Sequence, residues 1–375
     1  MGKKAGRYDK VMNTPIRILC VFSTLDRGGA ESMCMNLYRH IDRTKVQFDF
    51  VKHSHNKGAF EDEITNLGGK IFEAPRLKIH NYIQYKKWWV NHLRNHPEHQ
   101  IVHGHFFTIS SIYFKFCKQM KRITIGHCHS SKPEKNGIKS CIKSSLLSNV
   151  EKYSTYCMAC SQKSGEWLFP HRKFKVLNNA IDTDVFKCSK EKREKARQIF
   201  GFHDELIIGH VGNFAPVKNH SFAVDVFEKI HQERPDAKLV LVGGGDSSEI
   251  QRKVLNLGLT DSVVFTGVRS DIADILQALD AFVFPSLNEG LPVTVVEAQA
   301  AGLKCFISNT VTKEVDLTGR CTFLPIDDVN LWTNAILSSD LTRADTSNAI
   351  IQAGYDIHTT AKWLERFYLK MQAEK

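Results

Sequence analysis

No apolar run in this sequence approaches the roughly 20 residues that a helix needs to cross a bilayer. The segment from Met1 to Asn13 is basic and polar and lacks the hydrophobic stretch of a secretory signal. Gly6 stands where a myristoylation motif needs Ser or Thr. We therefore expect a cytoplasmic protein without a transmembrane helix, signal peptide or acyl anchor.

The sequence has ten cysteines, but their spacing does not describe a disulfide framework or a metal centre. Most of them stand inside apolar stretches, where free thiols behave as small hydrophobic side chains. Cys157 and Cys160 form a single CxxC pair, and no second pair follows it. We therefore expect neither a zinc site nor a redox pair.

Acidic residues are scarce in part of the first half, which concentrates the net charge of +11 there. Only Glu134 stands near a group of basic side chains, namely Lys115, Lys118, Lys121, Arg122, Lys132, Lys135, Lys139 and Lys143. This group is either a solvated surface or a contact with an anionic membrane or nucleic acid. No nucleic-acid-binding signature accompanies the charge. We favour the membrane and expect a protein that is peripheral at the inner face of the cell membrane.

A chain of 375 residues exceeds what one hydrophobic core usually serves and suits two domains. Apolar runs alternate with helical stretches in both halves, and several runs are continuous, which is typical of strands covered on both faces. The predicted strands are Ile16–Phe22, Phe48–Lys52, Lys70–Glu73, Ile101–His103, Ile123–His127, Tyr156–Ala159, Leu206–Val211, Leu239–Val242, Val263–Thr266, Ala281–Phe284, Cys305–Ser308 and Thr322–Leu324. This order predicts an α/β protein with two doubly wound parallel sheets.

The domain boundaries follow from this alternation. We expect a first domain over residues 1–175, a second over 176–355 and a C-terminal helix within 356–375. The last predicted helix, Ala361–Gln372, has one apolar side and follows the completed second sheet, so we expect it to pack back on the first domain. Two such domains would face a cleft, and ligands of these folds bind at the carboxyl ends of the strands.

Two glutamates, Glu289 and Glu297, stand in the most informative stretch of the sequence. Pro292 and Gly302 mark the start and the end of a predicted helix. Glu289 therefore lies in the loop before this helix, and Glu297 lies more than one turn inside it, on a face with small apolar neighbours. A carboxylate there needs a partner, and a ligand rich in hydroxyl groups would supply one.

Two strand-to-helix turns are suited to phosphate. Gly28 and Gly29 precede the predicted helix Glu31–His40, where glycine lets the backbone approach an anion; a plain turn is the alternative. In the second half Asn219 can cap a helix, and Lys218 can reach a phosphate at the same end; a solvated lysine is the alternative. The first spacing is not GxGxxG, which argues against a nicotinamide cofactor.

Two further loops follow strands of the second half. Gly243 to Asp246 predicts a tight turn rather than a cofactor loop, because no acidic residue stands at the expected ribose distance. The loop from Gly267 to Asp271 could present its backbone to the edge of a base.

Taken together, these motifs resemble the retaining GT-B glycosyltransferases of family 4, especially those that build bacterial capsule or exopolysaccharide. The resemblance extends from Ile16 to about Tyr368 and is most specific at Gly28–Glu31, at Lys218–Asn219, at Gly267, and from Pro285 to Ala298. It implies two Rossmann-like domains around a cleft, with the acceptor on the N-terminal domain and the nucleotide-sugar on the C-terminal one.

The resemblance also implies roles for single residues. Glu297 would bind the ribose hydroxyls, Glu289 the donor sugar and Lys218 the diphosphate, and His105 would point at the sugar near the bond that breaks. The implied catalytic residues are His105, Glu289 and Lys218. The implied donor-binding residues are Gly28, Gly29, Asn213, Lys218, Gly267, Val268, Arg269, Glu289, Gly290, Leu291 and Glu297. The implied acceptor-binding residues are His127, His129 and Ser130.

One position departs from the family pattern. The family usually has Arg five residues before the lysine, and Asn213 stands there, which removes a fixed charge but keeps a neutral hydrogen-bond donor. Lys218 and the helix N-termini would stabilise the nucleoside diphosphate in place of a metal. Asp182-Thr183-Asp184 resembles the interdomain stretch of this family and not the Asp-x-Asp metal motif of the other common transferase fold.

Four histidines and one cysteine form an alternative metal cluster, namely His103, His105, His127, His129 and Cys128. Side chains alternate along a strand, from which we expect that these histidines cannot all face one way. We therefore expect no metal site and no cofactor apart from the nucleotide-sugar substrate.

The predicted function is transfer of a sugar, with retention, from a nucleotide-sugar that we expect to be UDP-linked. The acceptor would be a glycan or lipid-linked glycan in surface polysaccharide biosynthesis. Retention follows only from the resemblance, because no carboxylate is clearly placed as a covalent nucleophile. Two alternatives stay open: a non-catalytic subunit that binds sugar nucleotides, which Asn213 favours, and a nucleotide-sugar epimerase of the same fold.

Overall fold

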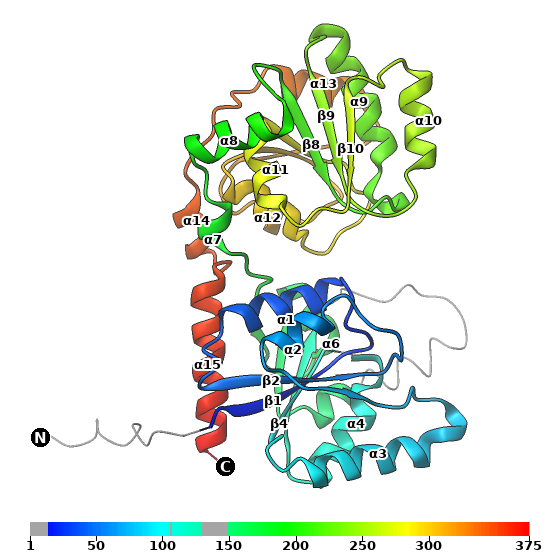
Figure 1. Cartoon of the computed structure of the whole chain (residues 1–375), viewed down its shortest axis with the longest axis vertical. Coiled ribbons are helices and arrows are strands. Elements are labelled where there is room, and N and C mark those ends of the chain that lie inside the picture. The colour runs from blue at the N-terminus through cyan, green and yellow to red at the C-terminus, as the bar shows by residue number, and fades with distance from the viewer. Residues whose placement is uncertain (1–13, 106, 130–148, 375) are drawn as a thin grey trace, which may run out of the picture. The chain divides into compact units, whose positions relative to one another are not determined.

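The computed structural model describes residues 14–105, 107–129 and 149–374 of the chain. The chain forms two compact units: unit 1 contains the residues up to Ala180 and those from Ile357 onward, and unit 2 contains Ile181–Asp356 (Figure 1). The predicted boundaries, after residues 175 and 355, lie slightly earlier. Within the described part of the chain, no helix has the length and apolarity to cross a membrane.

Unit 1 is built on one parallel sheet of seven strands, in the order β3-β2-β1-β4-β5-β6-β7. Its strands are β1 (Ile16–Val21), β2 (Val46–Lys52), β3 (Ile71–Glu73), β4 (Ile101–Gly104), β5 (Ile123–Cys128), β6 (Tyr156–Ala159) and β7 (Lys175–Val176). Alternate residues of β1 enter two different hydrophobic clusters, Ile18 and Cys20 on one face and Leu19 and Val21 on the other. This confirms the prediction of strands buried on both faces.

Helices cover both faces of this sheet. They are α1 (Gly29–His40), α2 (Glu61–Asn66), α3 (Tyr82–Asn95), α4 (Phe107–Gln119), α6 (Gln162–Leu168), α15 (Ile357–Ala373) and the short 3₁₀ turn η1 (Ile79–Asn81). Residues of α1 and α15 contribute to the cluster on one face, and residues of α3, α4 and α6 contribute to the cluster on the other.

The last helix, α15, belongs to unit 1. Leu364, Tyr368 and Met371 are buried in the core on the α1 face, and the Tyr368 hydroxyl lies 2.6 Å from Nδ1 of His103. The helix begins at Ile357, four residues before the predicted start at Ala361. The two threonines of its first turn have low helix propensity, and the sequence pattern therefore obscures this start.

Unit 2 holds a second parallel sheet of six strands, in the order β10-β9-β8-β11-β12-β13. Its strands are β8 (Ile207–Val211), β9 (Lys238–Val242), β10 (Val263–Gly267), β11 (Ala281–Phe284), β12 (Lys304–Ser308) and β13 (Cys321–Leu324). Its helices are α7 (Thr183–Phe186), α8 (Lys190–Phe200), α9 (His220–Glu233), α10 (Ser248–Asn256), α11 (Ile272–Ala278), α12 (Val293–Ala300), α13 (Val329–Leu337) and α14 (Ser347–Gln352), with 3₁₀ turns η2 (Pro216–Lys218) and η3 (Lys313–Val315). The predicted fold class, two doubly wound parallel-sheet domains, is confirmed.

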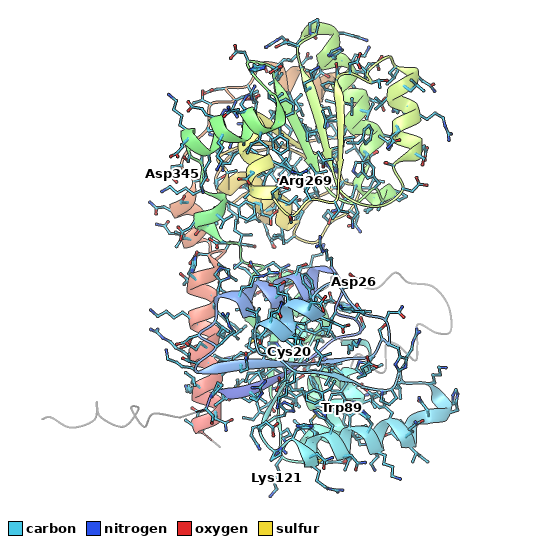
Figure 2. All side chains as sticks on the ribbon, in the orientation of Figure 1. Cys20, Asp26, Trp89, Lys121, Arg269 and Asp345 are labelled. Carbon is cyan, nitrogen blue, oxygen red and sulfur yellow. The ribbon has the colours of Figure 1, made fainter. Side chains whose placement is uncertain are left out.

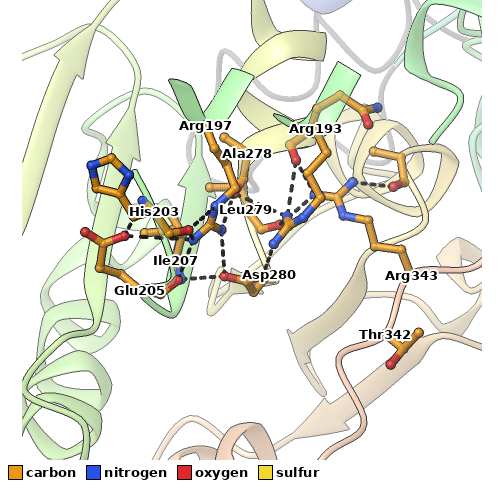
Figure 3. Close-up of polar contacts among 12 residues, drawn as sticks. Arg193, Arg197, His203, Glu205, Ile207, Ala278, Leu279, Asp280, Thr342 and Arg343 are labelled. Atoms are coloured by element: carbon orange, nitrogen blue, oxygen red, sulfur yellow. Dashed lines mark hydrogen bonds and ion pairs between the residues drawn. The ribbon is translucent and has the colours of Figure 1, made fainter. Parts of the chain in front are cut away.

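Three arginines hold the C-terminal end of α11 in place (Figure 3). Arg193 donates to Leu279 O at 2.6 Å, Arg197 donates to Ala278 O at 3.1 Å, and Arg343 donates to Leu279 O at 2.6 Å. The last carbonyls of a helix have no partner within the helix, and these guanidinium groups supply one. The contacts fix α11 beside the strand that leads to Glu289.

Candidate active site

Four loops with predicted site residues leave the same edge of the unit 2 sheet. The strands are all parallel, and the loops after β8, β9, β10 and β11 therefore start at the carboxyl edge. Gly243 N donates to Gly267 O at 3.0 Å, and Leu287 N donates to Val217 O at 2.8 Å. Backbone hydrogen bonds thus connect neighbouring loops in pairs.

Lys218 and Glu289 meet at this edge. Nζ of Lys218 lies 2.7 Å from Oε1 of Glu289 and 5.0 Å from the centre of the Phe284 ring. The two side chains keep 22% and 18% of their exposure, so a ligand can reach both. In the same loop Gly290 is exposed and Leu291 is half-buried. The structure therefore brings together the two predicted catalytic residues of this half.

Ser286 connects the Glu289 loop to the Lys218 turn. This residue is fully buried, and its Oγ lies 2.8 Å from both Glu289 Oε1 and Val217 O. The single hydroxyl proton can serve only one of these acceptors at a time. Thr310 Oγ1 donates to Ser286 O at 2.8 Å. Sequence reasoning gave Ser286 no role of its own, because only the folded chain shows what its hydroxyl touches.

The turn before α9 differs from the prediction in one respect. The Asn219 side chain does not cap the helix, and the prediction that it can is wrong. Asn219 has a φ of +54°, a left-handed conformation that asparagine tolerates better than most residues. The N-terminus of α9 therefore has no side-chain cap, and its first backbone amides are suited to an anion.

Glu297 lies half-buried on α12. Its carboxyl group makes no hydrogen bond or ion pair with any residue that the structure describes, and burial raises its pKa to about 8. Desolvation penalises the charged form of such a carboxyl group, and no partner offsets that penalty, so the group favours its protonated form. This is the property expected of a group whose partner is a ligand.

Asn213 follows β8 and contacts the next loop. Its Oδ1 accepts a hydrogen bond from Gly244 N at 3.3 Å, which leaves the Nδ2 group as a donor on an exposed side chain. Gly243, with a φ of +156°, passes so close to Gly212 O that a Cβ there would collide with it. The loop after β9 is thus a tight turn against Asn213, as the sequence predicts.

The loop after β10 presents backbone and one apolar side chain. Gly267 has a φ of +67°, and Val268 is 63% exposed. Arg269, labelled in Figure 2, does not point freely outward: its Nε donates to Asp271 Oδ1 at 2.8 Å, and its guanidinium lies 5.7 Å from the Phe200 ring centre. Gly267 and Val268 can therefore approach a flat base, while Arg269 is paired with Asp271 at the surface.

In unit 1, Gly28 forms the N-cap of α1, with an extended backbone and no side-chain cap. A Cβ on Gly28 would collide with the Glu31 carboxyl group, whereas a Cβ on Gly29 would meet nothing within 4 Å. Space therefore exists beside the first amides of α1. Burial raises the pKa of Glu31, which lessens the negative charge next to this opening.

Four imidazoles gather on one face of β4 and β5. Ring centres lie 4.3 Å apart for His103 and His105, 4.1 Å for His127 and His129, and 5.1 Å for His105 and His129. The expectation that they cannot all face one way is wrong. Residues two apart on a strand share a face, and the register pairs His103 with Ile125, which puts all four on the same side.

These histidines are neutral at ordinary pH. Burial lowers the pKa of His103 and His129 to about 3 and that of His105 and His127 well below the usual value. Nδ1 of His105 lies 2.8 Å from Nε2 of His129, while the buried Nε2 atoms of His105 and His127 have no partner within the described chain. Neutral ring nitrogens of this kind can bind sugar hydroxyls.

The same cluster offers ligand atoms for a metal. Ring nitrogens of His103, His105 and His127 lie within 4.8 Å of one another, as do the ligand atoms of Cys20, Cys34 and His105. Zinc prefers such nitrogen and sulfur ligands in a tetrahedral arrangement. Two of these nitrogens, Nε2 of His103 and Nδ1 of His127, lie 3.2 Å apart and already serve as partners for each other.

Sequence reasoning missed a cavity of about 440 Å³ in unit 1. Residues just after β1, β2 and β3 line it, among them Ser23, Thr24, His53, Ser54, Asn56 and Arg76, and none of its lining residues is acidic. Their positions after predicted strands are the one signal that could have pointed to this cavity, because no motif marks them.

Two other predicted positions need a separate statement. Ser130 lies outside the described residues. Asp182 caps the short helix α7: its Oδ1 accepts from Asp184 N at 3.1 Å and from Val185 N at 3.2 Å. Asp182 is thus the N-cap residue of α7.

Comparisons with known proteins agree on one family. Residues 27–185 match the model for Glycosyltransferase Family 4, and residues 192–316 match the model for Glycosyl transferases group 1. The chain is 32% identical over 357 residues to the putative glycosyltransferase EpsF of Bacillus subtilis, covering 91% of this chain and 93% of that protein. It is 25% identical over 319 residues to the capsular polysaccharide biosynthesis glycosyltransferase CapH of Staphylococcus aureus, covering 80% and 82%.

Solved structures share the whole fold. The complex of Anabaena Alr3699/HepE with UDP and glucose matches with a TM-score of 0.76 at 19% identity, over 95% of this chain and 100% of that one. A glycosyltransferase from Rickettsia africae matches with a TM-score of 0.77 at 16% identity, over 96% and 100%. Together with the relative that covers nearly the full length, these findings show that the chain belongs to the glycosyltransferases of family 4, with the GT-B fold.

Proposed function

We propose that this glycosyltransferase moves a sugar from a UDP-sugar, with retention of the anomeric configuration, to a glycan or lipid-linked glycan in surface polysaccharide biosynthesis. The observation that carries the proposal is the meeting of Lys218 and Glu289, 2.7 Å apart, at the carboxyl edge of the unit 2 sheet. The complexes of HepE with UDP support uridine as the nucleoside of the donor. CapH supports the pathway, and a UDP-Gal:alpha-D-GlcNAc-diphosphoundecaprenol galactosyltransferase of Escherichia coli, 32% identical over 142 residues, supports a lipid-linked acceptor.

Donor binding exchanges the partners of these two side chains. The diphosphate takes the Lys218 ammonium, and the sugar hydroxyls take the Glu289 carboxylate. Each charged group keeps a partner throughout, so neither is left buried and unpaired. The ribose hydroxyls supply the partner that Glu297 lacks, and Gly267 and Val268 face the base.

The leaving diphosphate needs positive potential in place of a metal. Lys218 and the uncapped N-terminus of α9 supply it in unit 2. The Nδ2 group of Asn213 adds a neutral donor where relatives usually have a guanidinium. We propose that turnover needs no metal ion.

Unit 1 takes the acceptor in this scheme. His105 contacts the transferred sugar, and its neutral, unpartnered Nε2 can accept or donate one hydrogen bond to a hydroxyl. His129 stacks on the His105 ring, and the His127 ring packs against it at a tilt of 38°. The cavity at Arg76 has room for further sugar residues or a phosphate of the acceptor.

A panel of nucleotides tests the donor site first. UDP should raise the thermal unfolding temperature more than GDP or ADP at equal concentration. Lys218→Met should lower UDP affinity at least about tenfold, because a charge-assisted hydrogen bond contributes roughly 1.5–3 kcal/mol. Lys229→Met is the matched control, since Lys229 is an exposed lysine of the same unit, and it should leave UDP affinity unchanged.

Turnover then separates the proposal from its two rivals. Three results together support retaining transfer. UDP release requires a lipid-linked glycan acceptor, it persists in EDTA, and NMR shows a product with the donor's anomeric configuration. UDP binding without release on any acceptor of this type would point to a non-catalytic subunit, which the missing arginine at Asn213 favours. Conversion of the donor sugar without an acceptor would point to an epimerase.

A further inference from the structure

The start of α3 and the turn before it present an unusual surface in unit 1 (cyan in Figure 1). Six exposed residues, here called the α3 patch, form it: Arg76, Lys78, Tyr82, Ile83, Lys86 and Lys87. We propose that the α3 patch docks on an anionic lipid surface. The proposal rests on the lipid-linked acceptor of the proposed function, because such an acceptor is reached at a membrane.

Two hydrophobic side chains of the patch are exposed. Ile83 is 80% exposed and Tyr82 is 40% exposed, although both stand on a helix whose other face is buried in the core. Single exposed apolar side chains are common, but here two adjacent ones stand at the end of a helix between lysines. An isoleucine and a tyrosine in such a position suit the boundary between lipid headgroups and acyl chains.

The charge of the patch has one sign. Residues 74–97 contain no Asp or Glu, while they contain Arg76, Lys78, Lys86, Lys87 and Arg94. None of these five side chains forms an ion pair with a residue that the structure describes. On α8 of unit 2, by contrast, Lys190 pairs with Glu194. The α3 patch therefore keeps its positive charge uncompensated, as contact with anionic headgroups requires.

The helix period places the key side chains together. Lys86 and Lys87 follow Ile83 by three and four positions, so all three lie on one side of α3. Ile83 can enter the headgroup region while the two lysines extend beside it to phosphate groups. Lys115 and Lys118 of the neighbouring helix α4 are exposed as well and add charge to the same unit.

The patch is held rigidly. The Tyr82 ring lies 6.0 Å from the Phe116 ring of α4, and the buried Trp89, labelled in Figure 2, stacks on Tyr113 at 4.9 Å. In the turn, Asn81 accepts from Lys78 N at 2.7 Å through Oδ1. A surface that is ordered before binding loses little conformational entropy when it docks.

The patch adjoins the cavity of unit 1. Arg76 belongs to both, and Asn81 Nδ2 donates to Arg76 O at 2.9 Å, which ties the cavity rim to the start of α3. Docking through Ile83 would therefore hold the Arg76 end of the cavity close to the lipid. That arrangement suits an acceptor whose lipid stays in the membrane while its phosphate and sugars enter the protein.

Vesicle flotation of the full-length chain tests the inference. Vesicles of equal parts phosphatidylglycerol and phosphatidylcholine should bind the protein, and pure phosphatidylcholine vesicles should not. Each lysine near an anionic surface contributes about fivefold to partitioning, so Lys86→Glu with Lys87→Glu should weaken it at least about thirtyfold. Ile83→Ser should weaken it by a smaller factor without changing the charge. Lys195→Glu with Lys229→Glu makes the same charge change in unit 2 and should have little effect.

The outcomes separate this inference from the proposed function. UDP binding and transfer to a water-soluble acceptor should be the same in all these variants, because the α3 patch lies outside the donor-binding residues. Equal binding to both kinds of vesicle, or full binding by the Lys86/Lys87 variant, would overturn the inference even if transfer is observed. Loss of duplex-DNA binding in that variant, with vesicle binding intact, would overturn it in favour of nucleic acid. If flotation occurs as predicted but no transfer is observed, the membrane inference holds and the proposed transferase activity is refuted.

Discussion

The two glutamates of the candidate site differ in how their charge is neutralised. Lys218 and Glu289 neutralise each other at 2.7 Å, whereas Glu297 stays without a partner and keeps a proton because burial raises its pKa to about 8. The sequence predicts that Glu297 needs a partner, since it stands on an apolar helix face. Which partner the Glu289 carboxylate takes in the free protein is not predictable, because Lys218 lies 71 positions away in the chain.

Glu297 should make the stability of unit 2 depend on pH. Its pKa is about 8 in the folded protein against an ordinary value of 4.5, so the folded state binds more protons between these values. Stability therefore falls as pH rises from 4.5 to 8, and the loss is complete above 8. Glu297→Gln removes the free-energy cost of a charged carboxylate at this position. The unfolding temperature at pH 9 should therefore be higher in the variant, by about 2–4 °C for each kcal/mol of stability recovered.

The matched measurement compares the unmodified protein with Glu297→Gln at pH 4.5, where the two unfolding temperatures should converge. Glu249→Gln is the control, because Glu249 is an exposed glutamate of unit 2. An equal advantage of Glu297→Gln at pH 4.5 and pH 9 would contradict the assignment of the raised pKa. If Glu297 holds the ribose as we propose, the variant should also bind UDP more weakly.

At the scale of elements, continuous apolar runs predict nearly every strand to within two residues of its observed bounds. The exception is β7, Lys175–Val176, a two-residue edge strand without an apolar run of its own. The prediction that the four histidines cannot share a face failed for a different reason. It considered the alternation of side chains along single strands, whereas the register between β4 and β5 places the histidines of both strands on the same face. Short edge strands and interstrand register are set by tertiary contacts, which local patterns do not contain.

The end of α11 depends on a side chain far along the chain. Arg343 donates to Leu276 O, Leu279 O and Ala301 O, each at 2.6 Å, and burial lowers its pKa to about 10. Arg343→Met should lower the free energy of unfolding of unit 2 by about 3 kcal/mol, because buried carbonyls lose their donor. Urea denaturation measures the change. Arg252→Met, at an exposed position, should shift it by less than about 0.5 kcal/mol.

At the scale of the whole molecule, each unit has its own pair of hydrophobic clusters around its own sheet. Unit 2 is continuous in sequence, whereas unit 1 takes its last helix from the C-terminal end of the chain. Sequence patterns predict two sheets and an amphipathic final helix. The cavity behind Arg76 could not be predicted, because it arises from three loops that only the folded sheet brings together.

Core substitutions should therefore act on one unit at a time. Leu364→Ala on α15 should destabilise unit 1 by about 2–5 kcal/mol, and Ile336→Ala on α13 should destabilise unit 2 by a similar amount. Hydrogen exchange should quicken in β1, β2 and β4 for the first variant and in β8, β9 and β11 for the second. Faster exchange in both sheets of either variant would show that the units unfold together.

The return of α15 to the first sheet sets an order of events during synthesis. A ribosome releases every residue of unit 2 before it releases Tyr368, whose hydroxyl reaches His103. The second half can thus finish folding while the first still waits for its closing helix, with the apolar surface meant for Leu364 and Met371 uncovered. That interval is when the nascent protein would most need a chaperone, and a message cut short near its end would yield a complete unit 2 beside an unfinished unit 1.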